Sequence, residues 1–236
     1  MTGPAPDGRA EPWVEVRVTE LDSAAIGLGP DAAARPAAHA LLRRLCAQYL
    51  GCSPEQVPLA RRCVTCGATD HGQPRLEPAP PGAARYVSLS HSHPWAAVAL
   101  GNVPVGVDVE AFRTDVAWNR LRPFVLHSDD EVPQDQRDWL RVWTRKEALA
   151  KMTGHGLTRP LARIHLGPPH PDGWRHTPDE PAHSRVRSLD HDRCAIAVAV
   201  ATAAADTAVT VRAQWSAPPP GTPADGRGAL REESAR

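Results

Sequence analysis

Valine recurs at every second position of the segment VPVGVDVE (103–110), and this alternation is the strongest constraint on how the chain folds. Successive side chains of a β-strand point to opposite faces, so the valines share one face while Asp108 and Glu110 share the other. We therefore predict a strand with one apolar face toward the core and two carboxylates on the opposite face. Taken alone, those carboxylates are typical of an ordinary solvent-exposed strand face.

A helix that carries the only two lysines of the chain is predicted for residues 138–152, with Gly154 ending it. At about 100° per residue, one side of this helix is apolar and consists of Trp139, Val142, Trp143, Leu149 and Ala150. Lys146 falls within that apolar side, whereas Glu147 and Lys151 lie along its edge. Because an unpaired buried charge is costly, Lys146 needs an anionic partner.

Asp108, Glu110 and Glu147 together provide hard oxygen ligands suited to Mg²⁺, which keeps positions for water and for substrate phosphate. Mn²⁺ is the alternative metal. Lys151 lies one turn after Glu147 and can hold a phosphate oxygen or protonate a leaving group, since phosphoryl chemistry depends on positioning and charge neutralisation. The pattern predicts a metal-dependent enzyme that acts on phosphate.

A strand and a helix are predicted near the start of the chain. Alternating valines indicate a strand at 13–18, and apolar residues at spacings of three and four indicate a helix from 31 to about 51. Pro36 suits the first turn of this helix. His39 and Arg43 lie one turn apart on its polar face.

Two further strands are predicted at 86–91 and 95–100. Gly101-Asn102 is a two-residue turn signal, so we expect it to join strand 95–100 to strand 103–110 as a hairpin.

Between 52 and 82 the chain is rich in proline and irregular. Cys63 and Cys66 there supply half of a zinc site, but no second pair follows at finger spacing, so a structural loop is the preferred interpretation over a metal site.

Composition excludes several classes of partner. Basic and acidic residues number 27 each, so the charge does not favour nonspecific binding to nucleic acid. No run approaches the ~20 apolar residues of a membrane span, and the first residues lack a signal-peptide core, so we expect a cytoplasmic protein without a membrane partner. Five cysteines fit reduced thiols. Segments 1–12 and 216–236 are rich in proline, glycine and charge, and we expect them to be disordered.

A weak internal repeat suggests two related halves. LSHSHPWAAVAL (89–100) aligns without gaps to LDHDRCAIAVAV (189–200), although chance similarity between strands rich in alanine and valine explains the match as well. We expect an N-terminal half at 13–105 and a C-terminal half at 106–215. A chain duplicated in this way forms its own cleft, so we expect a monomer.

The segments VGVDVE (105–110) and WTRKEALAK (143–151) resemble the paired motifs of the Sfp-type 4′-phosphopantetheinyl transferases, (V/I)G(V/I)D(V/I)E and W(T/S)xKE(A/S)xxK. The segment LSHS (89–92), the loop from Cys63 to Pro74 and the glycines after the helix are also similar to that family. The resemblance runs in order from about residue 31 to 161.

The resemblance implies an α+β fold that is a pseudo-dimer of two similar halves, with the active site between them. It implies transfer of the 4′-phosphopantetheine group of coenzyme A to a serine of an acyl- or peptidyl-carrier protein, with release of adenosine 3′,5′-bisphosphate. Asp108, Glu110 and Glu147 would bind Mg²⁺, Glu147 would help deprotonate the serine, and Lys151 would assist the leaving group. The coenzyme A contacts implied are His39, Arg43, Gln73, Pro74, Ser90, His91, Lys146 and Lys151.

Two departures from the family pattern remove positive charge. His39 stands where the family commonly has an arginine that holds the 3′-phosphate of coenzyme A, and Gln73 replaces a lysine. Arg35, Arg43 and Arg75 are candidates to supply the missing charge. A noncatalytic paralogue that binds carrier domains but has weakened coenzyme A binding is therefore the alternative. A metal-dependent nuclease is a weaker alternative, because a chain of neutral net charge has no excess of positive charge to bind a phosphate backbone. Which carriers are preferred stays open among fatty-acid, polyketide and nonribosomal-peptide pathways.

Overall fold

The computed structural model describes residues 11–21, 30–112, 118–178, 180, 183–189 and 191–216. Most of the two segments expected to be disordered, 1–12 and 216–236, lies outside these described residues. Ser216 lies inside them and is the last residue of a strand. Within the described residues, no helix is both long and apolar enough to cross a bilayer.

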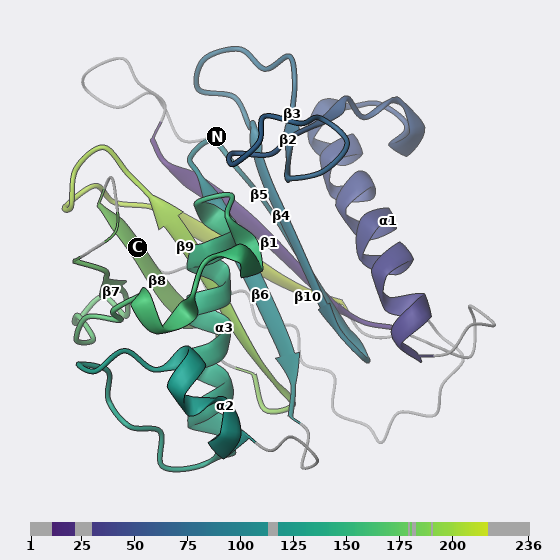
Figure 1. Cartoon of the computed structure of the whole chain (residues 1–236). Helices are drawn as coiled ribbons and strands as arrows, with labels where there is room; N and C mark the ends of the chain where they lie inside the picture. Colours follow the sequence, from purple (N-terminus) through teal and green to yellow (C-terminus); the bar gives the residue numbers. More distant parts are fainter. Residues whose placement is uncertain are drawn as a thin grey trace.

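The chain forms two β-sheets with helices on their outer faces, an α+β architecture as predicted (Figure 1). The first sheet has the order β10 (Thr210–Ser216), β1 (Trp13–Glu20), β5 (Trp95–Gly101), β4 (Tyr86–Ser92), β3 (Gln73–Leu76) and β2 (Leu59–Arg62). The second has the order β6 (Val105–Ala111), β9 (Cys194–Ala201), β8 (Ser184–Leu189) and β7 (Arg175–His176). The α-helices are α1 (Pro30–Leu50), α2 (Trp118–Val125) and α3 (Gln136–Met152).

The strand predicted from alternating valines exists as β6, and its valines enter the central core. Val105, Val107 and Val109 are fully buried among inward side chains of β1, β5 and β9. The other faces of the sheets are covered by helices: α1 packs on β4 and β5, and α3 packs on β6 and β9. The polar face of β6 is therefore not solvent-exposed surface.

Small residues let α3 approach β6 closely. A Cβ atom placed on Gly106 would lie 1.9 Å from the carbonyl oxygen of Ala148, so only glycine fits at that position. The α3-facing positions of the neighbouring strand β9 are also small, namely Ala195, Ala197 and Ala199. This close packing brings the acidic edge of α3 over the carboxylates of β6.

Two details of the sequence-based prediction are wrong. The expected hairpin between β5 and β6 does not form, because β6 pairs with β9 while β5 pairs with β1 and β4. Asn102 is used elsewhere: its side chain accepts a hydrogen bond from the Trp13 N–H and donates one to the carbonyl of Glu11. Pro36 also does not lie in the first turn of α1, because the helix begins at Pro30.

The first and last strands of the described chain lie side by side. β10 pairs in parallel with β1, from Trp13 opposite Thr210 to Thr19 opposite Ser216. A strand from the C-terminal segment thus extends the sheet built by the N-terminal segment.

Candidate active site

A row of serines on β4 joins the two sheets. The hydroxyl oxygen of Ser88 accepts a hydrogen bond from the Val107 N–H at 3.0 Å, and that of Ser92 accepts one from the Ala111 N–H at 3.2 Å. The offset between the partners is constant, so β4 and β6 run alongside each other in the same direction. At this junction the backbone of β6 is hydrogen-bonded by serine side chains of β4 rather than by the backbone of β4. These bonds fix the register of β6 against β4.

The same row of serines holds the two acidic side chains of β6. Ser90 donates a hydrogen bond to Oδ1 of Asp108 at 2.6 Å, and Ser92 donates one to Oε2 of Glu110 at 2.7 Å. Ser90 is a predicted coenzyme A contact, but here its hydroxyl proton is donated to Asp108. Both carboxylates lie where the two sheets meet.

Asp108 is buried, with 2% of its surface exposed. Its Oδ1 atom also accepts a hydrogen bond from Nζ of Lys151 at 2.5 Å, and that ammonium donates to the Ser90 hydroxyl at 2.8 Å. Its Oδ2 atom is buried and has no hydrogen-bond partner among the described residues. A buried carboxylate oxygen without a donor is costly, so this atom is suited to a cation ligand.

Glu147 lies on α3 and is also buried. Burial is the largest cause that raises its pKa, and the negative charges of Asp108 and Glu110 act in the same direction, so that the pKa is about 7 despite the opposing effect of Lys151. The third predicted ligand is thus electrostatically coupled to the first two. The structure thus brings Asp108, Glu110, Glu147 and Lys151 into one region, in which Asp108 and Glu147 are buried.

The three carboxylates are not drawn into a tight cluster around one point. Among the described residues, the groups of three His, Cys, Asp or Glu side chains with ligand atoms within 4.8 Å of one another do not include Asp108, Glu110 and Glu147. Lys151 instead supplies positive charge directly to Asp108. The hard oxygen donors and the unpartnered Oδ2 of Asp108 nevertheless fit a divalent cation such as Mg²⁺.

Lys146 does not face this site, contrary to its predicted contact with coenzyme A. It is completely buried and forms an ion pair with Asp130. Its Nζ atom also donates hydrogen bonds to the carbonyls of Val125 at 2.7 Å and Leu161 at 3.3 Å. The anionic partner that its apolar surroundings require therefore exists, and it ties α3 to the end of α2 and to the turn at Leu161–Arg163.

A cleft of about 260 Å³ lies beside Lys151. Its lining comes from β2, β3, β4 and the turn after α3, namely Arg61, Gly72, Gln73, Pro74, Val87, Ser88, Leu89, Lys151, Gly154, His155 and Gly156. The structure thus brings the predicted contacts Gln73 and Pro74 to the same cleft as Lys151. Gln73 donates a hydrogen bond to the carbonyl of Val105 at 3.4 Å.

Positive charge gathers around His39 near this cleft. Burial lowers the pKa of His39, and the positive charges of Arg61, Arg35, His91 and Arg43 lower it further. We call Arg35, Arg43, Arg61 and His91, whose positive charges act on His39, the cationic group. Arg61 also lines the cleft, so the cationic group reaches the cleft through that side chain.

Of the three arginines considered as replacements for the missing charge, Arg35 and Arg43 lie in the cationic group. Arg43 is partly committed, because its Nη1 atom donates to the carbonyls of Pro54 and Val57. Arg75 does not line the cleft. Its guanidinium lies over the ring of Tyr86, 5.3 Å from the ring centroid.

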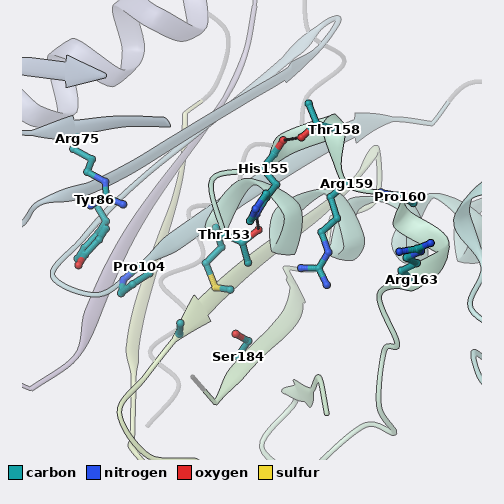
Figure 2. A pocket seen from close by; sticks show the side chains of 12 residues that line it. Arg75, Tyr86, Pro104, Thr153, His155, Thr158, Arg159, Pro160, Arg163 and Ser184 are labelled. Carbon is teal, nitrogen blue, oxygen red and sulfur yellow. Dashed lines mark hydrogen bonds between the residues drawn. The ribbon is translucent and has the colours of Figure 1, made fainter. Parts of the chain in front are cut away.

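A larger cavity of about 740 Å³ adjoins the cleft, and His155 lines both. Figure 2 shows Arg75 and Tyr86 from the first sheet on one side of it, and Arg159 and Arg163 from the segment after α3 on the other. Arg159 is held by an ion pair with Glu180. The two cavities together run between the two sheets and past the end of α3.

Comparison with known proteins shows to which family the chain belongs. Residues 104–201 match the family model of the 4′-phosphopantetheinyl transferase superfamily, a segment that contains β6 and α3. The transferase HetI of Nostoc sp. (strain PCC 7120) is 30% identical over 174 residues, which cover 70% of this chain and 69% of HetI. This chain belongs to the 4′-phosphopantetheinyl transferase superfamily. The resemblance inferred from the two motifs is confirmed.

Two other members of the superfamily match a shorter region. A 4′-phosphopantetheinyl transferase of Bacillus subtilis is 31% identical over 104 residues, covering 42% of this chain and 45% of the relative. The transferase ffp of the same organism is 28% identical over 112 residues, covering 45% of this chain and 49% of ffp. The chain aligns with about half the length of these two members.

Some residues of this superfamily member's site were not predicted. Ser88 and Ser92 bind β6, and their alternation with Ser90 was visible in the sequence as a polar strand face. Arg61 carried no local signal. It reaches the cleft because β2 pairs with β3, with Arg61 opposite Pro74. The sequence of either short strand alone does not predict this pairing.

Proposed function

We propose that this chain transfers the 4′-phosphopantetheine group of coenzyme A to a serine of an acyl- or peptidyl-carrier domain, releasing adenosine 3′,5′-bisphosphate. The observation that carries the proposal is that the buried Asp108 pairs with the partly exposed Lys151, near the buried Glu147, and that Lys151 lines a cleft together with Arg61. The superfamily membership supports the reaction class, and the site chemistry supports the assignment of roles.

Glu147 is the proposed proton acceptor. The serine oxygen of the carrier attacks the phosphorus attached to pantetheine, the bond from that phosphorus to the bridging oxygen of the pyrophosphate breaks, and the serine proton passes to Glu147 directly or through a water. A pKa of about 7 leaves a substantial fraction of Glu147 ionised at neutral pH while the group remains basic. The bond that forms and the bond that breaks are both P–O bonds, so no redox partner is required.

Lys151 is proposed to neutralise the leaving group. Its ammonium is the cation that lies between Asp108 and the cleft, with about a quarter of its side chain exposed. A compact ammonium on a flexible stem can move from Asp108 toward a phosphate oxygen. This would place positive charge on the oxygens of adenosine 3′,5′-bisphosphate as that group departs.

Mg²⁺ is the proposed metal, and Asp108, Glu110 and Glu147 are the residues that would hold it. When bound, it would neutralise phosphate charge and lower the cost of gathering three carboxylates in one buried region. The chain's own contribution is to hold the carboxylates through Ser90 and Ser92 and to keep Lys151 within reach.

Coenzyme A is proposed to bind in the cleft, with its phosphates toward the cationic group. Arg61 there supplies charge near the position where Gln73 replaces the lysine of the family pattern. His39 and His91 are close enough to influence each other electrostatically, so both can face one phosphate. Gln73 and Pro74 then contact the nucleotide through the cleft wall.

The two halves, 13–105 and 106–215, are proposed to be related by duplication. The strand order β1-β5-β4-β3 within the first sheet corresponds position by position to the order β6-β9-β8-β7 of the second. Each set of four strands carries one long helix, although α1 packs on β4 and β5 whereas α3 packs mainly on β6 and β9. The aligned segments 89–100 and 189–200 fall on the equivalent hairpins β4-β5 and β8-β9. A pseudo-dimer of this kind acts as a monomer, and we propose that it does so in the cytoplasm.

The transfer reaction is tested by incubating the purified chain with coenzyme A, Mg²⁺ and a panel of apo carrier domains. We expect the carrier to gain the mass of a phosphopantetheine group, and Glu147→Gln to abolish the gain while the variant stays folded. A carrier that binds without gaining mass would overturn the catalytic proposal in favour of the noncatalytic alternative. The panel also establishes which carriers are accepted.

The coenzyme A site is tested by comparing two neighbouring arginines of β2. Arg61→Ala is expected to raise the KM for coenzyme A by about 10- to 150-fold with little change in kcat, because a charge-assisted hydrogen bond contributes about 1.5–3 kcal/mol. Arg62→Ala is the matched control, since Arg62 is exposed and does not line the cleft. An equal effect of both substitutions would contradict the assignment of Arg61.

A further inference from the structure

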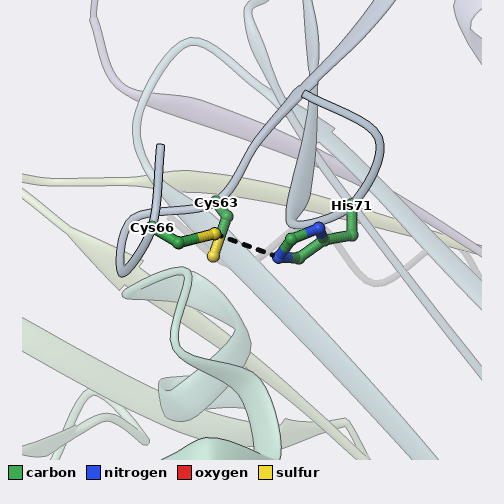
Figure 3. A group of neighbouring side chains, drawn as sticks. All are labelled: Cys63, Cys66 and His71. Atoms are coloured by element: carbon green, nitrogen blue, oxygen red, sulfur yellow. Dashed lines mark hydrogen bonds between the residues drawn. The ribbon is translucent and has the colours of Figure 1, made fainter. Parts of the chain in front are cut away.

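The loop between β2 and β3 gathers two thiols and one imidazole, away from the carboxylate site. Cys63, Cys66 and His71 each offer one ligand atom, and these atoms lie within 4.8 Å of one another (Figure 3). The Cys66 sulfur lies 3.4 Å from Nε2 of His71. A tetrahedral zinc ion with bonds of ~2.3 Å to sulfur and ~2.0 Å to nitrogen separates those two atoms by about 3.5 Å.

The backbone of the loop arranges the sulfurs before any ligand binds. The Cys63 N–H donates to the carbonyl of Ala68 at 2.8 Å, and the Gly67 N–H donates to the carbonyl of Cys63 at 3.0 Å. Gly67 has a φ of +73°, a left-handed conformation that favours glycine. Backbone N–H groups of Cys66 and Thr65 face the Cys63 sulfur, an arrangement that favours the thiolate form a metal ligand needs.

Asp70 orients the imidazole. Its Oδ1 atom lies 2.7 Å from Nδ1 of His71, on the opposite side of the ring from the Cys66 sulfur. With a proton on Nδ1 shared with Asp70, the lone pair of Nε2 points to the sulfurs. Zinc-binding histidines are usually oriented in this way: one ring nitrogen binds the metal and the other donates its proton to a carboxylate.

We propose that Cys63, Cys66 and His71 bind a zinc ion, with water completing its coordination at the exposed side of the loop. Two thiolates and an imidazole select a soft or borderline cation over Mg²⁺. The site is therefore distinct in chemistry from the carboxylate site. The sequence alone favours a structural loop, because no second cysteine pair follows at finger spacing, whereas the third proposed ligand is the histidine five residues after Cys66.

The proposed ion would stiffen one wall of the cleft. Gly72 follows His71 directly and is packed so tightly that a Cβ atom there would lie 2.5 Å from the backbone of Arg62 and Cys63. Val64, between the two cysteines, packs close to Gly154 in the turn after α3: a Cβ atom added to Gly154 would lie only 2.8 Å from a methyl group of Val64. Zinc would thus hold together the loop, the start of β3 and the turn after α3.

The test uses the full chain, purified under reducing conditions. Elemental analysis is expected to find about one zinc per chain, and the Cys63→Ser/Cys66→Ser variant is expected to lose it. Cys52→Ser is the matched control and should retain zinc, since Cys52 lies outside the cluster. Asp70→Asn should weaken zinc binding about 10–100-fold without removing a ligand.

Cobalt substitution separates this site from other clusters. Among the described residues, two further groups of three contain only histidine and aspartate, namely His127, Asp129, His165 and His170, Asp172, His176. Co²⁺ at the proposed site should show a thiolate-to-metal charge-transfer band that those groups cannot produce. Cobalt binding without this band, equal zinc in the double serine variant, or a Cys63–Cys66 disulfide in place of zinc would overturn the proposal.

A second readout addresses the cleft wall without any transferase assay. Chelating the zinc is expected to increase amide hydrogen exchange at 72–76, and restoring zinc should reverse the change. Unchanged exchange with full loss of zinc would overturn the role in stiffening the wall. Because zinc content and exchange do not depend on catalysis, failure of the proposed transfer reaction would leave both results interpretable.

Discussion

Replacing Glu147 with glutamine is expected to stabilise the metal-free protein at alkaline pH while abolishing transfer. The pKa of Glu147 rises from an ordinary 4.5 to about 7 in the folded protein, so ionising it there costs about 3 kcal/mol more than in the unfolded chain. Below about pH 4.5 both states are protonated and no stability is lost. Between about pH 4.5 and 7 the unfolded chain ionises Glu147 more readily than the folded protein does, so wild type progressively loses this stability and the loss is complete above about pH 7, whereas the neutral glutamine variant keeps it.

The assay is urea unfolding of both proteins in chelator at pH 5 and pH 8. At pH 8 the variant should be more stable by up to about 3 kcal/mol, or roughly 6–12 °C in Tm for a chain of this size. At pH 5, just above the ordinary pKa of 4.5, the difference should shrink to about 1 kcal/mol or less. Glu77→Gln, at an exposed position, is the control and should change stability by less than about 0.5 kcal/mol at either pH. A variant that is equally or less stable at pH 8 would refute the electrostatic reasoning.

Three further outcomes are expected. Gly106→Ala should destabilise the protein by at least about 1–3 kcal/mol in thermal unfolding, because its methyl group would collide with the carbonyl of Ala148; an unchanged Tm would contradict the close packing. Lys146→Met should lower the free energy of unfolding by about 3–5 kcal/mol, since it leaves Asp130 buried without its partner. A stable but inactive Lys146→Met protein would instead assign Lys146 to the reaction. Mg²⁺ should raise the Tm of wild type and leave Asp108→Asn nearly unchanged, and an equal rise in both would contradict the assigned ligands.

Much of the site could be predicted because its parts lie on two regular elements. A period of two assigns Asp108 and Glu110 to one face of β6, and a period of about 3.6 places Glu147 and Lys151 on one edge of α3. The same helical pattern placed Lys146 in apolar surroundings and required a partner for it. It did not show that the partner is Asp130, which lies in a loop 16 positions earlier.

The sequence by itself determined the elements, the family and the kinds of atoms available for chemistry. Tertiary structure alone decided that β6 pairs with β9 rather than β5, that Arg61 enters the cleft, and that His71 meets the two cysteines. The physical reason is range. Side-chain periodicity acts over a few residues and is visible in any one segment, whereas strand partners are selected by burial of whole faces, to which every segment of the core contributes.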